Sequence, residues 1–222
     1  AQGYGAVAGS AALGAMGDLK IPTGQIPAAS STKVGYVGNL SADWPVPAVT
    51  PLNVANANSY NMSKQSIVYD SLGTQHTLSQ YFVKTGPGAL TVHYSFDGAA
   101  PSATANLTFN AQGQLTAPIA PVPLTLATPG NGAAPLAFTV DYTGTTQFAG
   151  EAITTTNSTD GYASGTFVGV ELAQDGSVIA KYSNDQQQTV GTIALATFAD
   201  EGALSATSDT SWSETSQSGV AL

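Results

Sequence analysis

Few side chains in this sequence could carry out chemistry, and the most informative are two histidines. His76 and His93 fall in segments that alternate like β-strands, and Asp70 lies close to His76 in the chain. Imidazole and carboxylate groups together could ligate a metal ion or form a charge relay. Strand alternation, however, turns His93 away from the face that holds Leu90 and Phe96. We therefore interpret both histidines as polar residues on strand surfaces, with no role as metal ligands or catalysts.

The motifs of the main enzyme classes are absent from the sequence. It has no Gly-x-Ser-x-Gly nucleophile turn, no phosphate-binding glycine loop and no calcium loop. Asp200 and Glu201 are adjacent carboxylates, but neighbours on a strand point to opposite faces, so we predict a solvated turn there. We predict no catalytic, cofactor-binding or metal-binding residues, no cofactor and no enzymatic activity. Four matches to the N-glycosylation pattern are expected by chance in so Ser/Thr-rich a chain, at Asn39, Asn61, Asn106 and Asn157.

Composition excludes further functions. The 222 residues include five lysines and no arginine, and the net charge is −9. Nucleic-acid binding is therefore excluded, because phosphate contacts need clustered cations. The chain has no cysteine, which excludes disulfides and thiol catalysis and suits an extracellular protein that folds without oxidation. No apolar run approaches the roughly 18 residues that would predict a membrane span.

The elements that would position these residues are β-strands. Alternating segments at 65–70, 76–85 and 89–97, separated by short turns, predict an antiparallel meander. Five prolines within 116–135 predict a loop or an edge strand. Asp175-Gly176 predicts a hairpin turn between strands 166–172 and 177–182. Further strands are expected at 33–40, 106–110, 136–142 and 190–198. With no convincing helix, the predicted fold class is all-β.

Two patterned regions resemble the bacterial flagellar hook protein. The first is Val-Tyr-Asp-Ser-Leu-Gly-Thr-Gln-His-Thr-Leu at 68–78, followed by Tyr-Phe-Val-Lys at 81–84. The second is Gln-Asp-Gly-Ser-Val at 174–178, with Lys-Tyr-Ser-Asn-Asp-Gln at 181–186 and Ile-Ala-Leu-Ala-Thr-Phe at 193–198. The resemblance runs from about residue 18 to 222 and is weakest over 98–155. One departure is Asp185, where glycine is common in the family.

The resemblance implies two β-rich domains, the outer one inserted into a discontinuous inner one. Residues 1–28 with 157–222 would form the inner hook domain, and residues 29–156 the outer, surface-exposed domain. The helical terminal segments of the family have no counterpart in this sequence. We therefore expect a fragment of the hook protein, monomeric and unable to polymerise by itself.

The function implied is that of a structural subunit of the flagellar hook, the flexible joint that passes torque from the motor and rod to the filament. The implied partners are other hook subunits in a helical homopolymer, the hook cap, the distal rod and the hook–filament junction proteins, without nucleic acid and without membrane insertion. The implied location is extracellular, in the flagellum, after export through the flagellar type III secretion path.

An alternative function is an extracellular adhesin or carbohydrate-binding β-module. Low charge and two tryptophans, Trp44 and Trp212, would suit stacking on sugars. The two tryptophans are far apart in sequence, however, and no aromatic cluster surrounds either. We predict that Trp44 lies in a loop and that Trp212 is a packing anchor in the C-terminal tail. A third possibility, an extracellular hydrolase, has no motif to support it.

Overall fold

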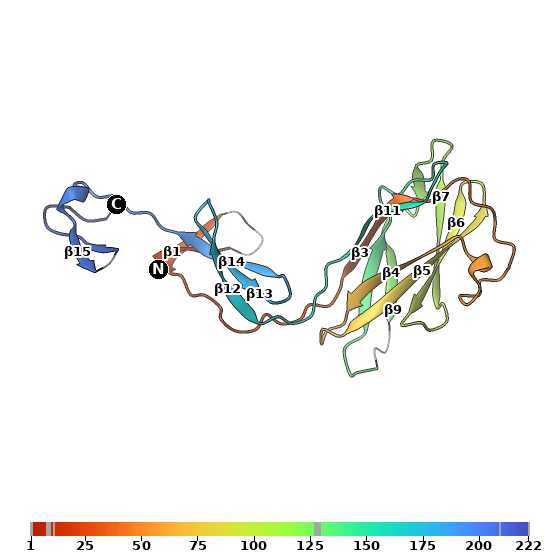
Figure 1. Cartoon of the computed structure of the whole chain (residues 1–222), viewed down its shortest axis with the longest axis horizontal. Coiled ribbons are helices and arrows are strands. Elements are labelled where there is room, and N and C mark those ends of the chain that lie inside the picture. The colour runs from red at the N-terminus through yellow and green to blue at the C-terminus, as the bar shows by residue number, and fades with distance from the viewer. Residues whose placement is uncertain (1, 8–9, 11, 127–129, 209, 222) are drawn as a thin grey trace. The chain divides into compact units, whose positions relative to one another are not determined.

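In the computed structural model of the chain (Figure 1), residues 2–7, 10, 12–126, 130–208 and 210–221 are described. The chain divides into two compact units. The central unit comprises residues 26–165, and the terminal unit comprises residues 1–25 together with 166–222. The predicted all-β fold is confirmed. The helical elements of the described ranges are two three-residue 3₁₀ turns, η1 (Ala57–Ser59) and η2 (Glu201–Ala203), and neither could cross a membrane.

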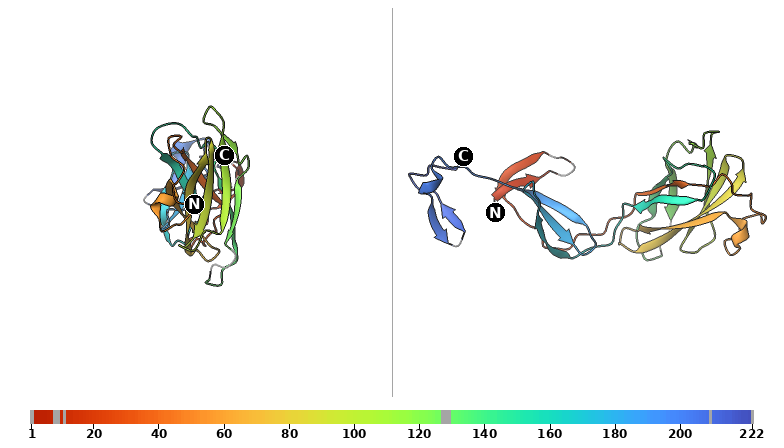
Figure 2. Two further views of the ribbon diagram at one scale, coloured as in Figure 1. Left: turned by 90° about the vertical axis from the view of Figure 1, so that its right-hand side faces the viewer. Right: turned by 45° about the horizontal axis from the view of Figure 1, so that its top comes forward.

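The central unit contains two β-sheets whose inner faces share one hydrophobic core (Figure 2). The five-stranded sheet is an antiparallel meander in the order β4-β5-β6-β7-β8. Its strands are β4 (Met62–Tyr69), β5 (Gln75–Gly86), β6 (Ala89–Phe96), β7 (Ala103–Phe109) and β8 (Leu115–Ala117). The four-stranded sheet has the order β11-β3-β10-β9, with β3 and β10 parallel. Its strands are β3 (Lys33–Asn39), β9 (Val122–Leu126), β10 (Leu136–Asp141) and β11 (Ile153–Thr159).

The alternation read from the sequence sets which side chains enter this core. Leu78, Gln80 and Phe82 of β5 are fully buried, as the alternation predicted. In β6 the buried apolar residues are Leu90, Val92, Tyr94 and Phe96, again as predicted, and Ser95 on the other face is buried as well. Because successive strand residues point to opposite faces, the hydrophobic pattern fixes the register of the whole meander.

The proline-rich stretch lies at sheet edges. It contributes β8, the edge of the five-stranded sheet, and β9, the edge of the four-stranded sheet. Proline cannot donate to a neighbouring strand, so Pro123 within β9 is tolerated at an edge and not in a central strand. This confirms the prediction of a loop or edge for 116–135, over the residues that are described.

A chain of buried polar groups crosses the core. The Tyr142 hydroxyl donates to Gln80 Oε1 at 2.5 Å and lies 2.8 Å from the Tyr94 hydroxyl. All three residues are at most 1 % exposed. Gln80 Nε2 has no hydrogen-bond partner within the described part of the chain. Burial raises the pKa of both tyrosines, so the network stays neutral at physiological pH.

The chain enters and leaves the central unit through paired backbone segments. Ile26 and Gly165 exchange two hydrogen bonds of 2.9 and 3.1 Å, and Ala29 and Tyr162 exchange two of 3.0 Å. One step further in, the Asp160 carboxylate accepts hydrogen bonds from the Thr32 and Lys33 amides and from the Thr32 hydroxyl. Burial raises the pKa of Asp160, but these hydrogen bonds outweigh it and lower the pKa below its usual value.

The terminal unit is built around a five-stranded antiparallel sheet in the order β12-β13-β14-β1-β2. Its strands are β1 (Gln2–Ala6), β2 (Leu13–Asp18), β12 (Phe167–Leu172), β13 (Ser177–Tyr182) and β14 (Gln187–Ile193). The predicted hairpin is confirmed, and Gly176 in its turn has a φ of +82°. A separate two-stranded sheet joins β15 (Ser205–Ser208) and β16 (Ser211–Ser213).

Glycines let one leucine cover the terminal sheet. A Cβ on Gly3 would lie 2.7 Å from Leu19 Cδ1, and one on Gly191 would lie 2.6 Å from Leu19 Cδ2. Gly3 and Gly191 belong to the neighbouring strands β1 and β14. The same Cβ atoms would lie still closer to backbone oxygens of the neighbouring strand, Thr192 O for Gly3 and Tyr4 O for Gly191, so the glycines are required for close packing.

The family departure at Asp185 falls in the turn between β13 and β14. Asp185 has a φ of +61°, in the left-handed region where glycine is at ease and aspartate is tolerated. The turn is closed by hydrogen bonds between the backbones of Tyr182 and Asp185 and of Tyr182 and Gln186. The substitution therefore leaves the turn in the conformation that a glycine would favour.

Candidate functional site

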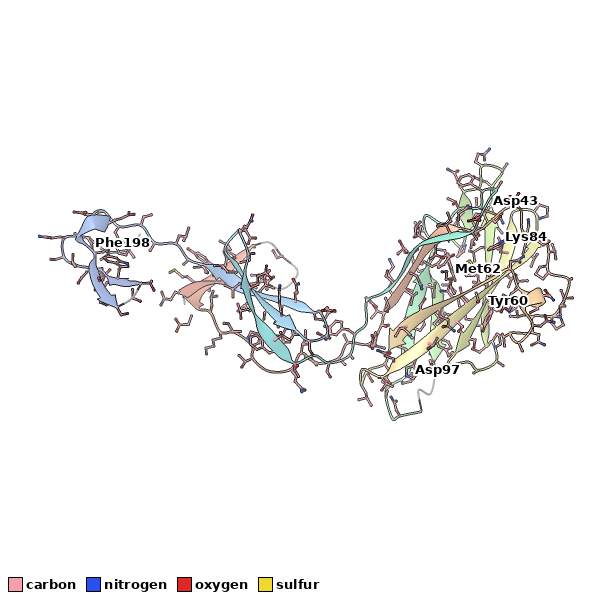
Figure 3. All side chains as sticks on the ribbon, in the orientation of Figure 1. Asp43, Tyr60, Met62, Lys84, Asp97 and Phe198 are labelled. Atoms are coloured by element: carbon pink, nitrogen blue, oxygen red, sulfur yellow. The ribbon has the colours of Figure 1, made fainter. Side chains whose placement is uncertain are left out.

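The only constellation singled out from the sequence that the structure assembles is centred on His76. Asp70 follows the end of β4, and a tight turn with Gly73 at a φ of +80° returns the chain into β5. His76 is the second residue of β5, and Asp97 follows the end of β6. Asp97 lies at one end of the central unit, away from Asp43 (Figure 3).

Both ring nitrogens of His76 face carboxylates. Nδ1 lies 2.8 Å from Asp97 Oδ2, and Nε2 lies 3.3 Å from Asp70 Oδ2. His76 is 5 % exposed and Asp70 is fully buried, whereas the Asp97 side chain is about half exposed. Burial lowers the pKa of His76, but hydrogen bonds and charges from Asp97 and Asp70 outweigh it and raise the pKa above its usual value.

Asp70 is the most heavily bonded carboxylate of this cluster. Its Oδ1 accepts from the backbone amides of Leu72 and Thr74, both at 2.9 Å. Its Oδ2 accepts from the Asn131 side-chain amide at 2.5 Å. Burial alone would raise the pKa of Asp70, but hydrogen bonds from Asn131, Thr74, His76 and Leu72 lower it to about 2. The carboxylate is therefore ionised inside the protein.

This arrangement does not supply a catalytic histidine. A charge relay needs one imidazole nitrogen on a carboxylate and the other on a nucleophile. In His76 both nitrogens are occupied by carboxylates, so no position is left for a nucleophile. Within the described residues no group of three or more His, Cys, Asp or Glu side chains could hold a metal ion. We therefore interpret the cluster as a structural tie.

The prediction that both histidines are surface residues is right for His93 and wrong for His76. His93 is partly exposed on the outer face of β6, opposite Tyr81. His76 is buried because it shares the core-facing side of β5 with Leu78, and because Asp70 and Asp97 lie against its ring. The alternation of β5 itself carried this signal.

The remaining candidates have local roles. Asp200 caps η2 by accepting from the Gly202 amide at 3.0 Å, and both Asp200 and Glu201 are exposed, as predicted for a solvated turn. Trp44 packs against the core of the central unit. The prediction that Trp212 is a packing anchor is wrong. Trp212 is 64 % exposed, and every other residue of the strands β15 and β16 is exposed as well.

The four glycosylation matches coincide with asparagines that hold the fold. Asn61 Nδ2 donates to the Pro45 carbonyl at 2.8 Å, and Asn157 Nδ2 donates to the Gln65 carbonyl at 2.7 Å. Asn39 Nδ2 donates to two backbone carbonyls, and the Asn106 side chain accepts from the Thr91 hydroxyl. A glycan on the amide nitrogen would compete with three of these four sets of hydrogen bonds.

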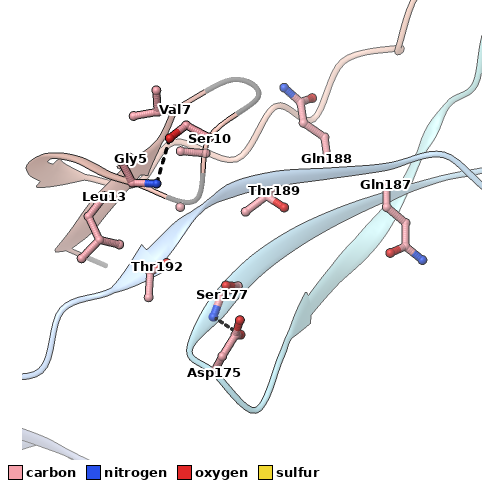
Figure 4. A pocket seen from close by; sticks show the side chains of 13 residues that line it. Gly5, Val7, Ser10, Leu13, Asp175, Ser177, Gln187, Gln188, Thr189 and Thr192 are labelled. Carbon is pink, nitrogen blue, oxygen red and sulfur yellow. Dashed lines mark hydrogen bonds between the residues drawn. The ribbon is translucent and has the colours of Figure 1, made fainter.

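An open groove of about 940 Å³ lies on the terminal unit (Figure 4). It lies between the β1–β2 hairpin and the strands β13 and β14. Its single charged lining residue, Asp175, accepts from the Ser177 amide of its own turn at 3.0 Å. The other described polar side chains of the lining are uncharged, so Asp175 has no second titratable group beside it among them.

The fold defines an all-β protein of two compact units, with the His76 cluster at one end of the central unit. The family model for "Flagellar basal body protein FlaE D2 domain" matches residues 39–162. This is more than half of the chain, and the chain belongs to that family.

The curated relatives are flagellar hook proteins. Flagellar hook protein FlgE of Escherichia coli K12 is 37 % identical over 213 residues, covering 92 % of this chain and 52 % of the relative. That of Treponema pallidum is 30 % identical over 247 residues, covering 92 % and 53 %. The chain thus spans about half the length of the curated relatives it matches. The crystal structure of Helicobacter pylori flagellar hook protein FlgE2 aligns with a TM-score of 0.47 and 18 % identity, over 65 % of this chain and 34 % of that one.

Proposed function

We propose that this chain forms part of a structural subunit of the bacterial flagellar hook, the joint that passes torque from the motor and rod to the filament. The observation that carries the proposal is the match to hook proteins over 92 % of the chain. The relatives are structural hook proteins, and the His76 cluster leaves no nitrogen for a nucleophile; both observations support a role in assembly and not in catalysis. The relatives give no support to the adhesin or carbohydrate-binding alternative.

The proposal extends to the division of the chain within a hook. Residues 1–28 with 157–222 form the inner hook domain, and residues 29–156 form the outer, surface-exposed one. The division into compact units supports a central domain inserted between two flanking segments, but it sets the boundaries at 25/26 and 165/166, so residues 26–28 and 157–165 belong to the central unit. The paired entry and exit of the chain at Ile26–Ala29 and Tyr162–Gly165 supports the insertion as well, because an inserted domain needs its two ends close together.

The proposed partners and location follow from the same role. Copies of the full-length subunit contact one another head to tail in a helical polymer. The hook cap, the distal rod and the hook–filament junction proteins contact its ends. The subunit reaches the cell exterior through the flagellar type III secretion path and stays in the flagellum.

Immunogold electron microscopy on the source bacterium tests this function. Antibodies raised against this chain should label the short curved segment between the cell envelope and the filament. Two controls are needed: antibody absorbed with the purified chain, and cells from which the gene has been deleted. Label over the cell surface or along other appendages would overturn the proposal, and binding to a glycan array would then revive the adhesin alternative.

A further inference from the structure

The His76 ring is held between two carboxylates. We propose that the Asp70–His76–Asp97 cluster is a proton-binding site that ties three segments of the central unit together only while the imidazole carries both of its N–H groups. The segments are the β4–β5 turn with the start of β5, the turn after β6, and the stretch around Asn131.

The number of N–H groups on the His76 ring decides whether both carboxylates can be satisfied. An ionised carboxylate can only accept hydrogen bonds, and a neutral imidazole has a single N–H to donate. Both ring nitrogens face carboxylate oxygens, at 2.8 and 3.3 Å. In the neutral state one nitrogen lone pair would point at a carboxylate oxygen, whichever tautomer formed. The observed geometry is therefore satisfied by the imidazolium ion.

Both carboxylates are held in place by further hydrogen bonds. Asp97 Oδ1 accepts from the Thr77 amide at 2.7 Å, and the Asp97 amide donates to the Thr77 carbonyl at 2.9 Å. Asp70 Oδ1 accepts from two amides of its own turn. Neither carboxylate can turn away from a neutral ring without disturbing the hydrogen bonds that its Oδ1 accepts, so loss of the proton strains the whole cluster.

The charges around the ring decide the direction of the effect. The titratable groups that act on His76, of the residues described, are Asp97 from the turn after β6 and Asp70 from the β4–β5 turn. Asn131, which contacts Asp70, is neutral. Asp70, with a pKa of about 2, stays ionised at every pH at which histidine titrates. Because the pKa of His76 is raised on folding, its stabilisation is complete below the usual histidine value of 6.5 and is lost as the pH rises through the raised value.

The tie has a defined reach. Asn131 Nδ2 donates to Asp70 Oδ2 at 2.5 Å and to the Thr74 hydroxyl at 2.8 Å, and the Ala134 amide donates to the Ser71 hydroxyl at 3.1 Å. The stretch 131–134 is thus fastened to the β4–β5 turn. Loss of the proton should loosen this end of the central unit in alkaline solution and leave its core strands in place.

Nuclear magnetic resonance of the full chain tests the proposal, because the sequence has only two histidines. Burial lowers the pKa of His93, so His93 serves as an internal reference. We expect one imidazole to titrate above 6.5 and the other below it, and a His93→Gln variant assigns them. Hydrogen exchange of the Leu72, Thr74 and Thr77 amides, expressed as protection factors, should drop as the pH passes through the His76 titration, by about tenfold for each unit of its elevation.

Two variants keep the test decisive. His76→Gln offers one amide donor group that does not titrate, so the fall in protection with pH should disappear. Asp97→Asn should lower the pH at which His76 titrates and should serve if the glutamine variant does not fold. The proposal is overturned if His76 titrates at or below the His93 value, or if protection of these amides stays constant across the His76 titration.

Discussion

Replacing Tyr142 with phenylalanine removes one oxygen atom from the centre of the central unit, and its cost can be worked out from the structure. The substitution leaves Gln80 Oε1 without the hydrogen bond that it accepts at 2.5 Å and Tyr94 without its partner at 2.8 Å. An unsatisfied buried polar group costs about 1–3 kcal/mol, so we expect Tyr142→Phe to lower the free energy of unfolding by about 2–4 kcal/mol.

Two further variants sharpen the expectation. Tyr94→Phe keeps the hydrogen bond between Tyr142 and Gln80 and loses only one interaction, so its cost should be about 1 kcal/mol. Combining Gln80→Met with Tyr142→Phe removes donor and acceptor together, and also removes the amide nitrogen that has no partner in the described structure. Replacing both partners with apolar groups is close to neutral. The double variant should therefore be more stable than Tyr142→Phe alone.

The two tryptophans make the assay specific to the central unit. Trp44 packs against the core of that unit, whereas Trp212 is exposed in the terminal unit. Urea unfolding followed by fluorescence in a Trp212→Phe background therefore reports the central unit alone. A loss of 2–4 kcal/mol should lower the urea midpoint by roughly 1–2 M. The reasoning is refuted if Tyr142→Phe costs no more than Tyr94→Phe, or if the double variant costs the sum of its two single changes.

Three other predictions concern packing and charge. Gly191→Ala should destabilise the terminal sheet by about 1–3 kcal/mol, because the new methyl group would clash with the Tyr4 backbone oxygen in β1 and would also displace Leu19; hydrogen exchange in β14 measures this, and unchanged exchange would contradict it. Asp160→Asn should lower the free energy of unfolding by only about 0.5–1 kcal/mol, since the site is largely exposed. The difference in stability from the parent should vanish as the pH falls through the lowered pKa of Asp160, and urea midpoints at several pH values test this. Asn131→Asp places a second carboxylate against Asp70 and should cost about 1–3 kcal/mol at pH 7, as measured by urea unfolding, whereas Asn131→Ala, which adds no charge, should cost less.

Alternation and proline placement were enough to predict much of the central unit. The core faces of β5 and β6 follow from a two-residue period, and the edge position of β9 follows from the missing amide of Pro123. Both signals are local in the sequence, which is why they could be read without a structure.

The N-terminal strands of the terminal unit were harder to predict because they lack a hydrophobic pattern. Residues 2–6 and 13–18 are rich in glycine and alanine, which disfavour strands, and neither strand was predicted. Glycines in β1 and β14 allow the close approach of the neighbouring strand and of Leu19, and these contacts depend on distant parts of the chain. In β12, Val168, Val170 and Leu172 share one face, but that face is open to solvent, at 67 %, 44 % and 58 % exposure.

The candidate site was predictable only in part. Asp70 and His76 are close in the sequence, and the alternation of β5 already turned His76 toward the core. Asp97 and Asn131 reach the cluster from turns far along the chain, and no local pattern marks them as partners. The meander explains why Asp97 lies beside His76, because it brings the end of β6 next to the start of β5.

The paired entry and exit of the central unit has an evolutionary consequence. Residues 26–29 and 162–165 lie side by side and are joined by backbone hydrogen bonds, which depend little on side-chain identity. The sequence between these two segments can lengthen, shorten or be exchanged as a whole, because the two segments that lead to the terminal unit keep their spacing. Recombination between lineages could thus replace the whole central unit in one event and leave the fold of the terminal unit unchanged.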